Sequence, residues 1–321
     1  ADTNGYWLVP FDEILYWGDA PDRIQSIDEP LFELVSESHW KQDDRMLVSH
    51  CNGHIKAYPV AILEAHEIVN DHIGDFYFAV TYCPLRGRGM SWNRTLEGEV
   101  TEFVVSGLLF RDNLNPYDRN TGSYWSQMRN LCIHGEHIES VPRPGMLFET
   151  DFRMLSSYFP SAEILTGTSG NACTDSTCNL HLSTTPLKSA ALSNDHIQPG
   201  EYYYGLINRD QAKLFGMDLF EPGVRVYSFG FRGKKMIVAG FKAMNVVVSF
   251  ETTGSAAGEI TALQDQFPVI MEDGKGNVYD IFGRVVSGPE KGNELTPGTG
   301  YRAKGFAWES LFESVEVFKD Q

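Results

Sequence analysis

The chain has 321 residues, of which 42% are apolar and 21% charged, and this composition excludes the disordered, collagen-like and coiled-coil classes. Its 43 acidic and 26 basic residues leave a net charge of −17, so the surface repels nucleic-acid phosphates and anionic lipid headgroups. No apolar run approaches the roughly 20 residues of a membrane span. We therefore expect no nucleic-acid partner and no membrane span. The expected ligand is a small molecule or a metal ion, and the sequence is compatible with a homo-oligomer.

The predicted elements are mostly strands. Residues 1–45 mix short aromatic pieces with turn signals and are predicted to be an N-terminal wrapping segment. From residue 46 onward the pattern is β-rich, and Asn52-Gly53 between two strand-like runs predicts a hairpin. Pro59 and Asp151 each precede a short helical pattern and are expected to begin a helix. The predicted fold class is α+β, predominantly antiparallel β with short helices.

A repeat in the sequence predicts how the strands are organised. The stretch KAYPVAILEAHEIVNDHIGDFYFAVTY aligns on RVYSFGFRGKKMIVAGFKAMNVVVSF, which places Tyr58 on Tyr227. Shorter blocks recur in the same order, and the last of them pairs DFRMLSSYFPSAEIL with GFAWESLFESVEVF. Because self-similarity indicates repeated structural units, we predict two tandem, related β-rich units at 46–168 and 223–321, the second a degenerate copy. A connector over 169–222 joins them.

Two observations favour export from the cytoplasm. Cys173 and Cys178 lie close together in the polar connector, where a short disulfide is sterically easy, and disulfides persist in oxidising compartments. The chain begins at Ala1 without an initiator Met, which suits a mature end left by signal peptidase and would equally suit a shortened chain. We expect the protein in the periplasm or outside the cell.

The other cysteines leave two interpretations. A disulfide between Cys51 and Cys132 is preferred, and it would leave Cys83 unpaired. Cys51 and Cys132 also each have two histidines close by in the sequence, and these ligand types suit copper or zinc. A metal site formed by the two segments is therefore the alternative.

Titratable groups that could carry chemistry lie in the first unit. His66 and Glu67 stand at the end of the first predicted helix and Cys83 at the end of a strand, whereas the aligned second copy has Lys235 in place of His66. A thiol becomes a thiolate when a base, a cation or a metal lies beside it. We predict Cys83 as a nucleophile or metal ligand and His66 as its base or co-ligand. The alternative is that Cys83 is a small buried core residue and His66 a capping histidine.

A second group of candidates surrounds a predicted turn. Asp118 to Gly122 combine an Asx-type start with a glycine that can take positive φ. Tyr117, Trp125 and Gln127 near this turn offer aromatic faces and hydrogen-bonding groups suited to a pocket. The alternative is that the rings fill the core face of a hairpin and that Asp118 only holds the turn.

The segments HEIVND, TYCPL, SGLLFRDNL and YDRNTGSYWSQ together resemble an exported prokaryotic family of uncharacterised proteins, domain of unknown function 3179. The resemblance covers about residues 20–168 and implies a secreted, lipid-anchored or periplasmic location. It also implies a site at the matching positions. These are His66, Glu67, Asn70, Asp71, Tyr82, Cys83, Ser106, Asp118, Trp125 and Gln127. The chain departs from the family at Arg86 and Arg88, where the pattern has a Cys or Thr and then small residues.

These observations lead to two functional hypotheses. The first is an exported oxidoreductase or metal-handling protein with one thiol-dependent or metal-thiolate site. Its catalytic residues would be Cys83, His66, Glu67 and Asp118, its substrate-binding residues Tyr82, Asn70, Tyr117, Trp125 and Gln127, and its metal ligands Cys83 and His66. Copper is expected first, because a soft thiolate and an imidazole suit it, and zinc next. The second hypothesis is a non-catalytic extracellular structural or assembly protein that keeps the family fold with a lost site.

Overall fold

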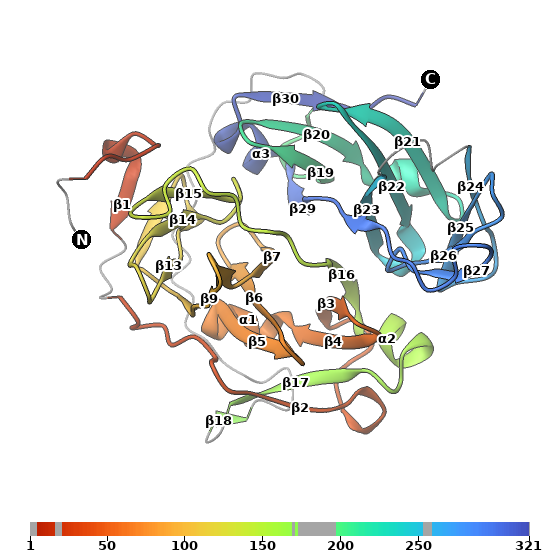
Figure 1. Cartoon of the computed structure of the whole chain (residues 1–321), viewed down its shortest axis with the longest axis horizontal. Coiled ribbons are helices and arrows are strands. Elements are labelled where there is room, and N and C mark those ends of the chain that lie inside the picture. Colours follow the sequence, from red (N-terminus) through yellow and green to blue (C-terminus); the bar gives the residue numbers. More distant parts are fainter. Residues whose placement is uncertain (1–4, 17–20, 169–170, 173–196, 253–258, 321) are drawn as a thin grey trace.

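The computed structural model describes residues 5–16, 21–168, 171–172, 197–252 and 259–320. Strands dominate these residues, and most neighbouring strands are antiparallel. They form two halves that stand side by side in Figure 1, a first half up to residue 172 and a second half from residue 197. The predicted α+β class with mainly antiparallel strands and short helices is confirmed.

The first half is built on a sheet with the strand order β16-β3-β4-β17. Its strands are β16 (Leu147–Asp151), β3 (Arg45–Cys51), β4 (His54–Pro59) and β17 (Glu163–Thr168). Helix α2 (Phe152–Tyr158) carries the chain from one edge of this sheet to the other, so β17 lies parallel to β4 while the other pairs are antiparallel. β18 (Asn171–Ala172) pairs with β17 at its edge.

Local sequence sets the turns and helix ends of this sheet as predicted. Asn52 and Gly53 both take positive φ, 50° and 82°, in the turn between β3 and β4. Helix α1 (Val60–His66) follows Pro59. Asp151 caps α2, since its Oδ1 accepts a backbone N–H of the first turn at 3.1 Å. The predicted hairpin and both predicted helices are therefore confirmed.

Smaller sheets complete the first half. One has the order β5-β6-β7, with β5 (Ile68–Ile73), β6 (Phe76–Cys83) and β7 (Arg88–Asn93). Another has the order β10-β13-β14-β15, with β10 (Phe103–Val104), β13 (Tyr117–Asp118), β14 (Tyr124–Ser126) and β15 (Leu131–His134). A short hairpin joins β8 (Thr95–Leu96) to β9 (Glu99–Val100).

The predicted wrapping segment adds edge strands to sheets of the first half. η1 (Phe11–Glu13) leads into β1 (Ile14–Tyr16), which pairs with β11 (Leu108–Phe110), and β11 pairs in turn with β12 (Asn113–Leu114). β2 (Pro30–Leu34) precedes η2 (Val35–Glu37) and pairs with β17. The segment therefore extends existing sheets.

The second half contains three four-stranded sheets among its described residues. The first has the order β29-β19-β20-β30, with β29 (Gly300–Lys304), β19 (Tyr202–Asn208), β20 (Gln211–Gly216) and β30 (Ser314–Val317). The second contains β21 (Arg225–Phe231), β22 (Lys234–Phe241), β23 (Val246–Thr252) and β28 (Thr296–Pro297). The third contains β24 (Ile260–Ala262), β25 (Val269–Asp273), β26 (Val278–Asp280) and β27 (Val285–Ser287). The helical segments are η3 (Met217–Phe220), η4 (Lys242–Met244) and α3 (Gly305–Leu311).

The two halves share a strand order. α2 joins β16 to β17 as α3 joins β29 to β30, and the strand after each helix lies parallel to the second strand of a hairpin, β17 to β4 and β30 to β20. The sheets β5-β6-β7 and β21-β22-β23 also share a register. Cys83, the last residue of β6, pairs with Arg88, the first of β7, as Phe241 of β22 pairs with Val246 of β23. Phe241 and Val246 are thus the counterparts of Cys83 and Arg88.

This correspondence differs from the predicted alignment. The alignment places Tyr58 of β4 on Tyr227 of β21, whereas the strand order matches β4 with β20 and β5 with β21. The strands β19 and β20 lie inside the predicted connector 169–222, so the second half begins before the predicted boundary at 223. The physical reason is that apolar strands of similar spacing align almost equally well when they are shifted by one strand.

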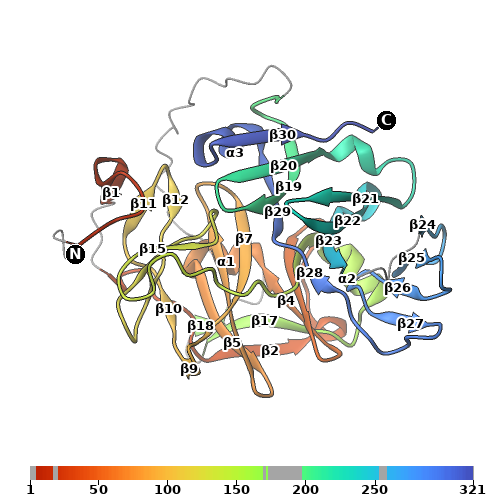
Figure 2. The same ribbon diagram turned by 45° about the horizontal axis from the view of Figure 1, so that its top comes forward.

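The two halves share one core. The largest cluster of buried apolar side chains contains Val48 and Tyr58 of the first half together with Ile237 and Phe250 of the second. β7 contacts β29, as Figure 2 shows, and β16 contacts β23. In the part of the chain that the structure describes, no helix has the length and apolar character needed to cross a membrane.

Candidate functional site

Cys83 lies in the interior of the first half. The residue is 1% exposed and packs in a cluster with Trp92 and Phe103. Its Sγ lies 3.7 Å from the carbonyl oxygen of Asp112. Burial raises the pKa of the thiol, and the carboxylate of Glu67 raises the same pKa further. Cys83 is therefore a neutral thiol at neutral pH in this structure.

His66 and Glu67 point to different surroundings. His66 ends α1, and its Nδ1 lies 2.9 Å from the carbonyl oxygen of Gln25. Glu67 follows with a φ of 57°, and its carbonyl oxygen accepts the N–H of Tyr82 at 2.6 Å. The structure thus brings Glu67 to the strand that ends in Cys83 and turns the His66 ring toward Gln25. An acid beside Cys83 does the opposite of what a base or cation would do for a thiolate.

Asp118 is the centre of a closed hydrogen-bond network. The residue is 0% exposed, and its carboxylate accepts the backbone N–H of Thr121 at 2.8 Å and the Nε1–H of Trp125 at 3.0 Å. The hydroxyl of Thr121 donates to the same carboxylate at 2.8 Å. Gly122 takes a φ of 69° and closes the turn with its N–H on the Asp118 carbonyl oxygen. The network holds the turn between β13 and β14.

The second half contains the same construction around Asp273. Its carboxylate accepts the N–H of Asn277 at 2.9 Å and the hydroxyl of Tyr279 at 2.8 Å, in the turn between β25 and β26. A glycine packs against each turn: a Cβ on Gly135 would lie 2.6 Å from Cα of Ser123, and one on Gly288 would lie 2.7 Å from Cα of Asn277. A carboxylate that recurs at the same turn in both halves has a structural role in each.

The other predicted substrate-binding residues also bond to protein groups. Asn70 is 0% exposed, and its Nδ2 donates to Asp28 at 2.7 Å and to the Phe103 carbonyl oxygen at 2.9 Å. Gln127, equally buried, donates to the Thr81 hydroxyl at 3.1 Å and accepts from Asn113 at 2.9 Å. These amides link neighbouring segments of the first half, and neither lines one of the four hollows found in the described part of the chain.

The two tyrosines among the predicted substrate-binding residues, Tyr82 and Tyr117, differ in exposure. Tyr82 is buried, its hydroxyl lies 3.5 Å from Nη1 of Arg45, and burial raises its pKa above the usual range. Tyr117 is half-buried, and its hydroxyl donates to Asp22 at 2.9 Å. Burial together with this acceptor raises the pKa of Tyr117 to about 12. Both phenols are therefore neutral hydrogen-bonding groups of the fold.

The structure does not form the disulfide predicted between Cys51 and Cys132. Cys51, Cys83 and Cys132 are free thiols. Cys51 packs against the large shared core, whereas Cys132 is buried in the smaller cluster that contains Cys83, so the two sulfur atoms belong to different parts of the first half. Cys173 and Cys178 lie outside the described residues. Within those residues, His, Cys, Asp and Glu side chains form no group of three that could hold a metal ion.

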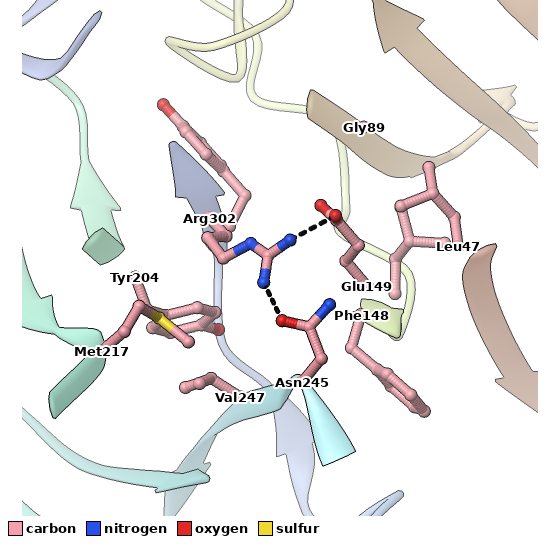
Figure 3. Close-up of a pocket in the computed structure, with 11 residues that line it drawn as sticks. Leu47, Gly89, Phe148, Glu149, Tyr204, Met217, Asn245, Val247 and Arg302 are labelled. Carbon is pink, nitrogen blue, oxygen red and sulfur yellow. Dashed lines mark hydrogen bonds and ion pairs between the residues drawn. The ribbon is translucent and has the colours of Figure 1, made fainter. Parts of the chain in front are cut away.

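A small pocket lies at the junction of the halves (Figure 3). Arg302 of β29 donates to Glu149 of β16 and to Asn245, which follows η4. Glu149 also accepts from Nε of Arg45 at 2.7 Å. The cavity volume is only about 30 Å³, the space of about one water molecule. Glu149 belongs to the first half and Arg302 to the second, so this ion pair joins the halves. The two residues occupy corresponding positions in β16 and β29.

A larger hollow, which we call the seam cavity, opens between the halves. Its volume is about 340 Å³. The lining comes from the β14–β15 turn, the segment before β16, the β19–β20 turn, the β21–β22 hairpin and the chain around β28. Its charged residues are Arg129, Arg143, Arg209, Lys234 and Glu251. Among the four hollows compared in the described part of the chain, it is the largest, and its lining is the richest in cations.

The cations of the seam cavity differ in their partners. Lys234 pairs with Glu251 at 2.6 Å, and Arg129 pairs with Asp210. Arg143 and Arg209 are exposed, and no acidic side chain of the described residues pairs with either. Arg209 sits in the turn between β19 and β20 with a φ of 52°, and its side chain is exposed. The cavity therefore has excess positive charge.

Sequence reasoning missed these residues. They come from four separate turns or strand ends, and no two of them form a motif. The composition contained a weak signal, because basic residues are the minority in a chain of net charge −17. A group of them in one hollow is therefore unexpected by chance. Only the tertiary structure brings them together.

Two β-rich halves with one strand order, a shared core and a cavity at the seam define the class of this protein. A family model described as "Protein of unknown function (DUF3179)" matches residues 21–315. The chain therefore belongs to this family, as the resemblance implied, and the match extends over both halves. The comparisons with curated proteins and with solved structures found no match.

Proposed function

We propose that this protein binds a small anionic molecule, one that carries carboxylate, phosphate or sulfate groups, in the seam cavity. The observation that carries the proposal is the convergence of Arg129, Arg143, Arg209 and Lys234 on a hollow of about 340 Å³. Ligand pockets for small molecules have volumes of about 300–1000 Å³, and this hollow lies at the lower end of that range.

The charge of the whole chain makes the local cations more informative. A protein of net charge −17 repels anions at long range, so an anion binds only where nearby cations outweigh that field. At physiological ionic strength the long-range part is screened beyond about 8 Å, which leaves the charges around the cavity in control. Arg143 and Arg209 have donor groups that the described acidic residues leave unused, so an anion gains their hydrogen bonds without breaking an existing pair.

The lining also supports a ligand with an apolar part. Phe231, Met236 and Ile207 contribute carbon surface next to the cations. Arginine binds carboxylate and phosphate through two parallel hydrogen bonds, which favours these groups over a halide in an open site. The proposed ligand is therefore a small organic acid or phosphate ester, with its charged group toward Arg143 and Arg209.

Isothermal titration calorimetry tests the proposal on the full chain. The probes are citrate and inorganic phosphate, with spermidine as the cationic comparison. Arg209→Glu should weaken citrate binding at least tenfold, because it removes a cation and adds an acid at the cavity. Lys41→Glu is the matched control, since it makes the same change of charge at an exposed residue that does not line the cavity.

Two outcomes contradict the proposal. One is an equal loss of affinity in Arg209→Glu and Lys41→Glu, which would mean that only the overall charge matters. The other is a wild-type protein that binds neither anion or binds spermidine as well as citrate. Circular dichroism of each variant checks the fold, and Arg209→Gln repeats the test without an added acid.

The thiol or metal role of Cys83 and His66 stays a prediction. The burial of Cys83 and the orientation of His66 toward Gln25 do not support it in this structure. Elemental analysis of wild type and Cys83→Ser, purified without chelators, tests it directly: copper or zinc present in the wild type and lost in the variant would establish a metal-thiolate site.

A further inference from the structure

Two arginines follow Cys83 at the positions where the chain departs from its family. Arg86 is 6% exposed and Arg88 is 1% exposed, so both guanidinium groups lie inside the protein. A buried cation is stable only when an opposite charge or a full set of acceptors compensates for lost hydration. The partners of these two side chains therefore decide whether the site is complete.

Arg88 lacks most of the acceptors that it needs. Its Nη2 donates to the carbonyl oxygen of Arg86, but its Nε and Nη1 are buried without a hydrogen-bond partner. Its guanidinium lies 5.7 Å from the ring centroid of Tyr301, which supplies a π face and no acceptor oxygen. Buried donors without partners are rare in folded proteins and indicate a missing acceptor.

Arg86 is only partly compensated. Its Nη2 donates to the carbonyl oxygen of Arg111 and lies 3.5 Å from the carboxylate of Asp112, which is 27% exposed. Its Nε is buried without a partner. One partly exposed carboxylate thus pairs with Arg86, and no carboxylate of the described residues forms an ion pair with Arg88.

The second half shows that the fold does not require these charges. The connection from β22 to β23 has the same length as the connection from β6 to β7, and its residues corresponding to Arg86 and Arg88 are Met244 and Val246. Val246 is 0% exposed and belongs to the shared core. An apolar residue fills this position well, so the arginines add something that packing alone does not explain.

Arg88 keeps its charge at neutral pH. Burial lowers its pKa to about 10, which leaves the guanidinium protonated. The nearby Cys83 thiol does not balance it, because burial and Glu67 raise the pKa of that thiol. Among the ion pairs of the described residues, Asp112 is the one carboxylate that pairs with either guanidinium, and it pairs with Arg86.

We propose that Arg88 and Arg86 bind a small inorganic anion of the size of chloride inside the first half. The ion would accept the unused N–H groups of Arg88 and share the charge of Arg86. Both guanidinium groups are buried, which favours a small monoatomic ion over an organic acid. It lies apart from the seam cavity and does not depend on the function proposed there, since neither arginine lines that cavity.

Bromide provides a direct test, because it replaces chloride and scatters anomalously. Crystals of the wild type soaked in bromide should show an anomalous peak in contact with the Arg88 guanidinium. A water molecule or nothing at that place, in crystals that take up bromide elsewhere, would overturn the proposal.

A stability measurement in solution tests the same site in variants. A ligand that binds only the folded state raises the unfolding midpoint as its concentration rises. Chloride and gluconate are mixed in different proportions at constant ionic strength. The unfolding midpoint of the wild type should rise as the share of chloride rises, and Arg88→Met should lose this increase.

Arg94→Met is the matched control. Arg94 is also buried, but its groups donate to the carbonyl oxygens of Thr101 at 2.8 Å and Asp71 at 3.3 Å. This variant should be less stable than wild type and keep the full chloride dependence. An equal chloride dependence in wild type and Arg88→Met would overturn the proposal, and so would a thiolate absorbance of Cys83 at neutral pH, because the thiolate would then be the counter-charge. If Arg88→Met does not fold, the bromide experiment on the wild type still decides.

Discussion

The turn at Asp118 and the seam cavity both gather polar side chains, and they differ in what these groups bond. At the turn, the Asp118 carboxylate takes its partners from Thr121 and Trp125. At the cavity, Arg143 and Arg209 have no acidic partner among the described residues. A polar group that is satisfied by the protein stabilises the fold, whereas an unsatisfied one at a hollow is available to a ligand. The motif-rich turn thus belongs to the fold, and the motif-free cavity is where a ligand is to be sought.

The largest effect is expected at the turn. Asp118→Ala should lower the free energy of unfolding by about 4 kcal/mol, because it removes several charge-assisted hydrogen bonds and leaves buried donors without an acceptor. Urea denaturation measures the loss. Asp273→Ala, at the corresponding turn of the second half, should lower stability to a similar extent, since its carboxylate accepts the same kinds of donor.

Asp118→Asn is the control for this prediction. It keeps one carbonyl oxygen as acceptor, so about half of the loss is expected. An Asp118→Ala variant with wild-type stability that no longer binds citrate would reverse the comparison, because the turn would then be a binding site and not part of the scaffold.

His50 sharpens the comparison through pH. It is 7% exposed, stacks on Phe282 at a centroid distance of 4.5 Å, and burial with the nearby charge of Arg284 lowers its pKa to about 4. Between pH 4 and about 6.5 the unfolded chain therefore binds a proton that the folded chain does not, so stability falls as the pH is lowered through this range. A shift of this size corresponds to about 3 kcal/mol lost on going from pH 7 to pH 4.

The measurement compares urea denaturation of wild type and His50→Phe at the two pH values. Phe keeps the stacked ring and cannot be protonated, so the variant should lose about 3 kcal/mol less than wild type over this range. His39→Gln, at an exposed histidine, should follow the wild type. Equal pH dependence in wild type and His50→Phe would show that His50 is hydrated.

Cys83→Ser should have a smaller effect on stability. A hydroxyl in place of a buried thiol needs a stronger hydrogen bond than the 3.7 Å contact to Asp112 provides, so a loss of about 1–2 kcal/mol is expected. Citrate binding should be unchanged, because Cys83 does not line the seam cavity. Site-resolved alkylation of the native wild type should label the half-buried Cys51 before Cys83. Rapid labelling of Cys83 would contradict its burial and show that this thiol is accessible and reactive.

The sequence predicts the fold better than the site, for physical reasons. Asn52-Gly53, Pro59 and Asp151 act through their own backbone geometry or through a neighbour in sequence, so the hairpin and both helix starts can be predicted locally. The alignment of one half on the other cannot be predicted locally, because apolar strands align at more than one offset. The interpretation of Asp118 as a turn-holding residue was available as an alternative, and the neighbouring Thr121 and Gly122 were its signal.

The candidate site depends on distances that no local pattern contains. Arg129 and Arg209 are far apart in the sequence and meet only because β14, β15, β19 and β20 end at the same seam. The burial of Cys83 likewise follows from packing against Trp92 and Phe103, which the letters around it do not specify. Residue types identified the possible chemistry, whereas burial decided which residues are accessible to a ligand.

The smallest expected effect on stability is at the seam cavity, and its sign is opposite to the effect expected at the Asp118 turn. Arg143→Gln or Arg209→Gln should raise the stability of the ligand-free protein by about 0.5 kcal/mol, because each removes one of several like charges that face a common hollow. The loss of a cation also increases the net negative charge, which opposes this gain. Lys41→Gln has the same effect on net charge without the local repulsion, so the difference in stability between the cavity variants and Lys41→Gln measures the local repulsion.

The same cavity variants should weaken citrate binding. Greater stability together with weaker binding is expected of residues kept for a ligand, whereas a loss of stability in both cavity variants would place Arg143 and Arg209 with Asp118 among the residues that hold the fold.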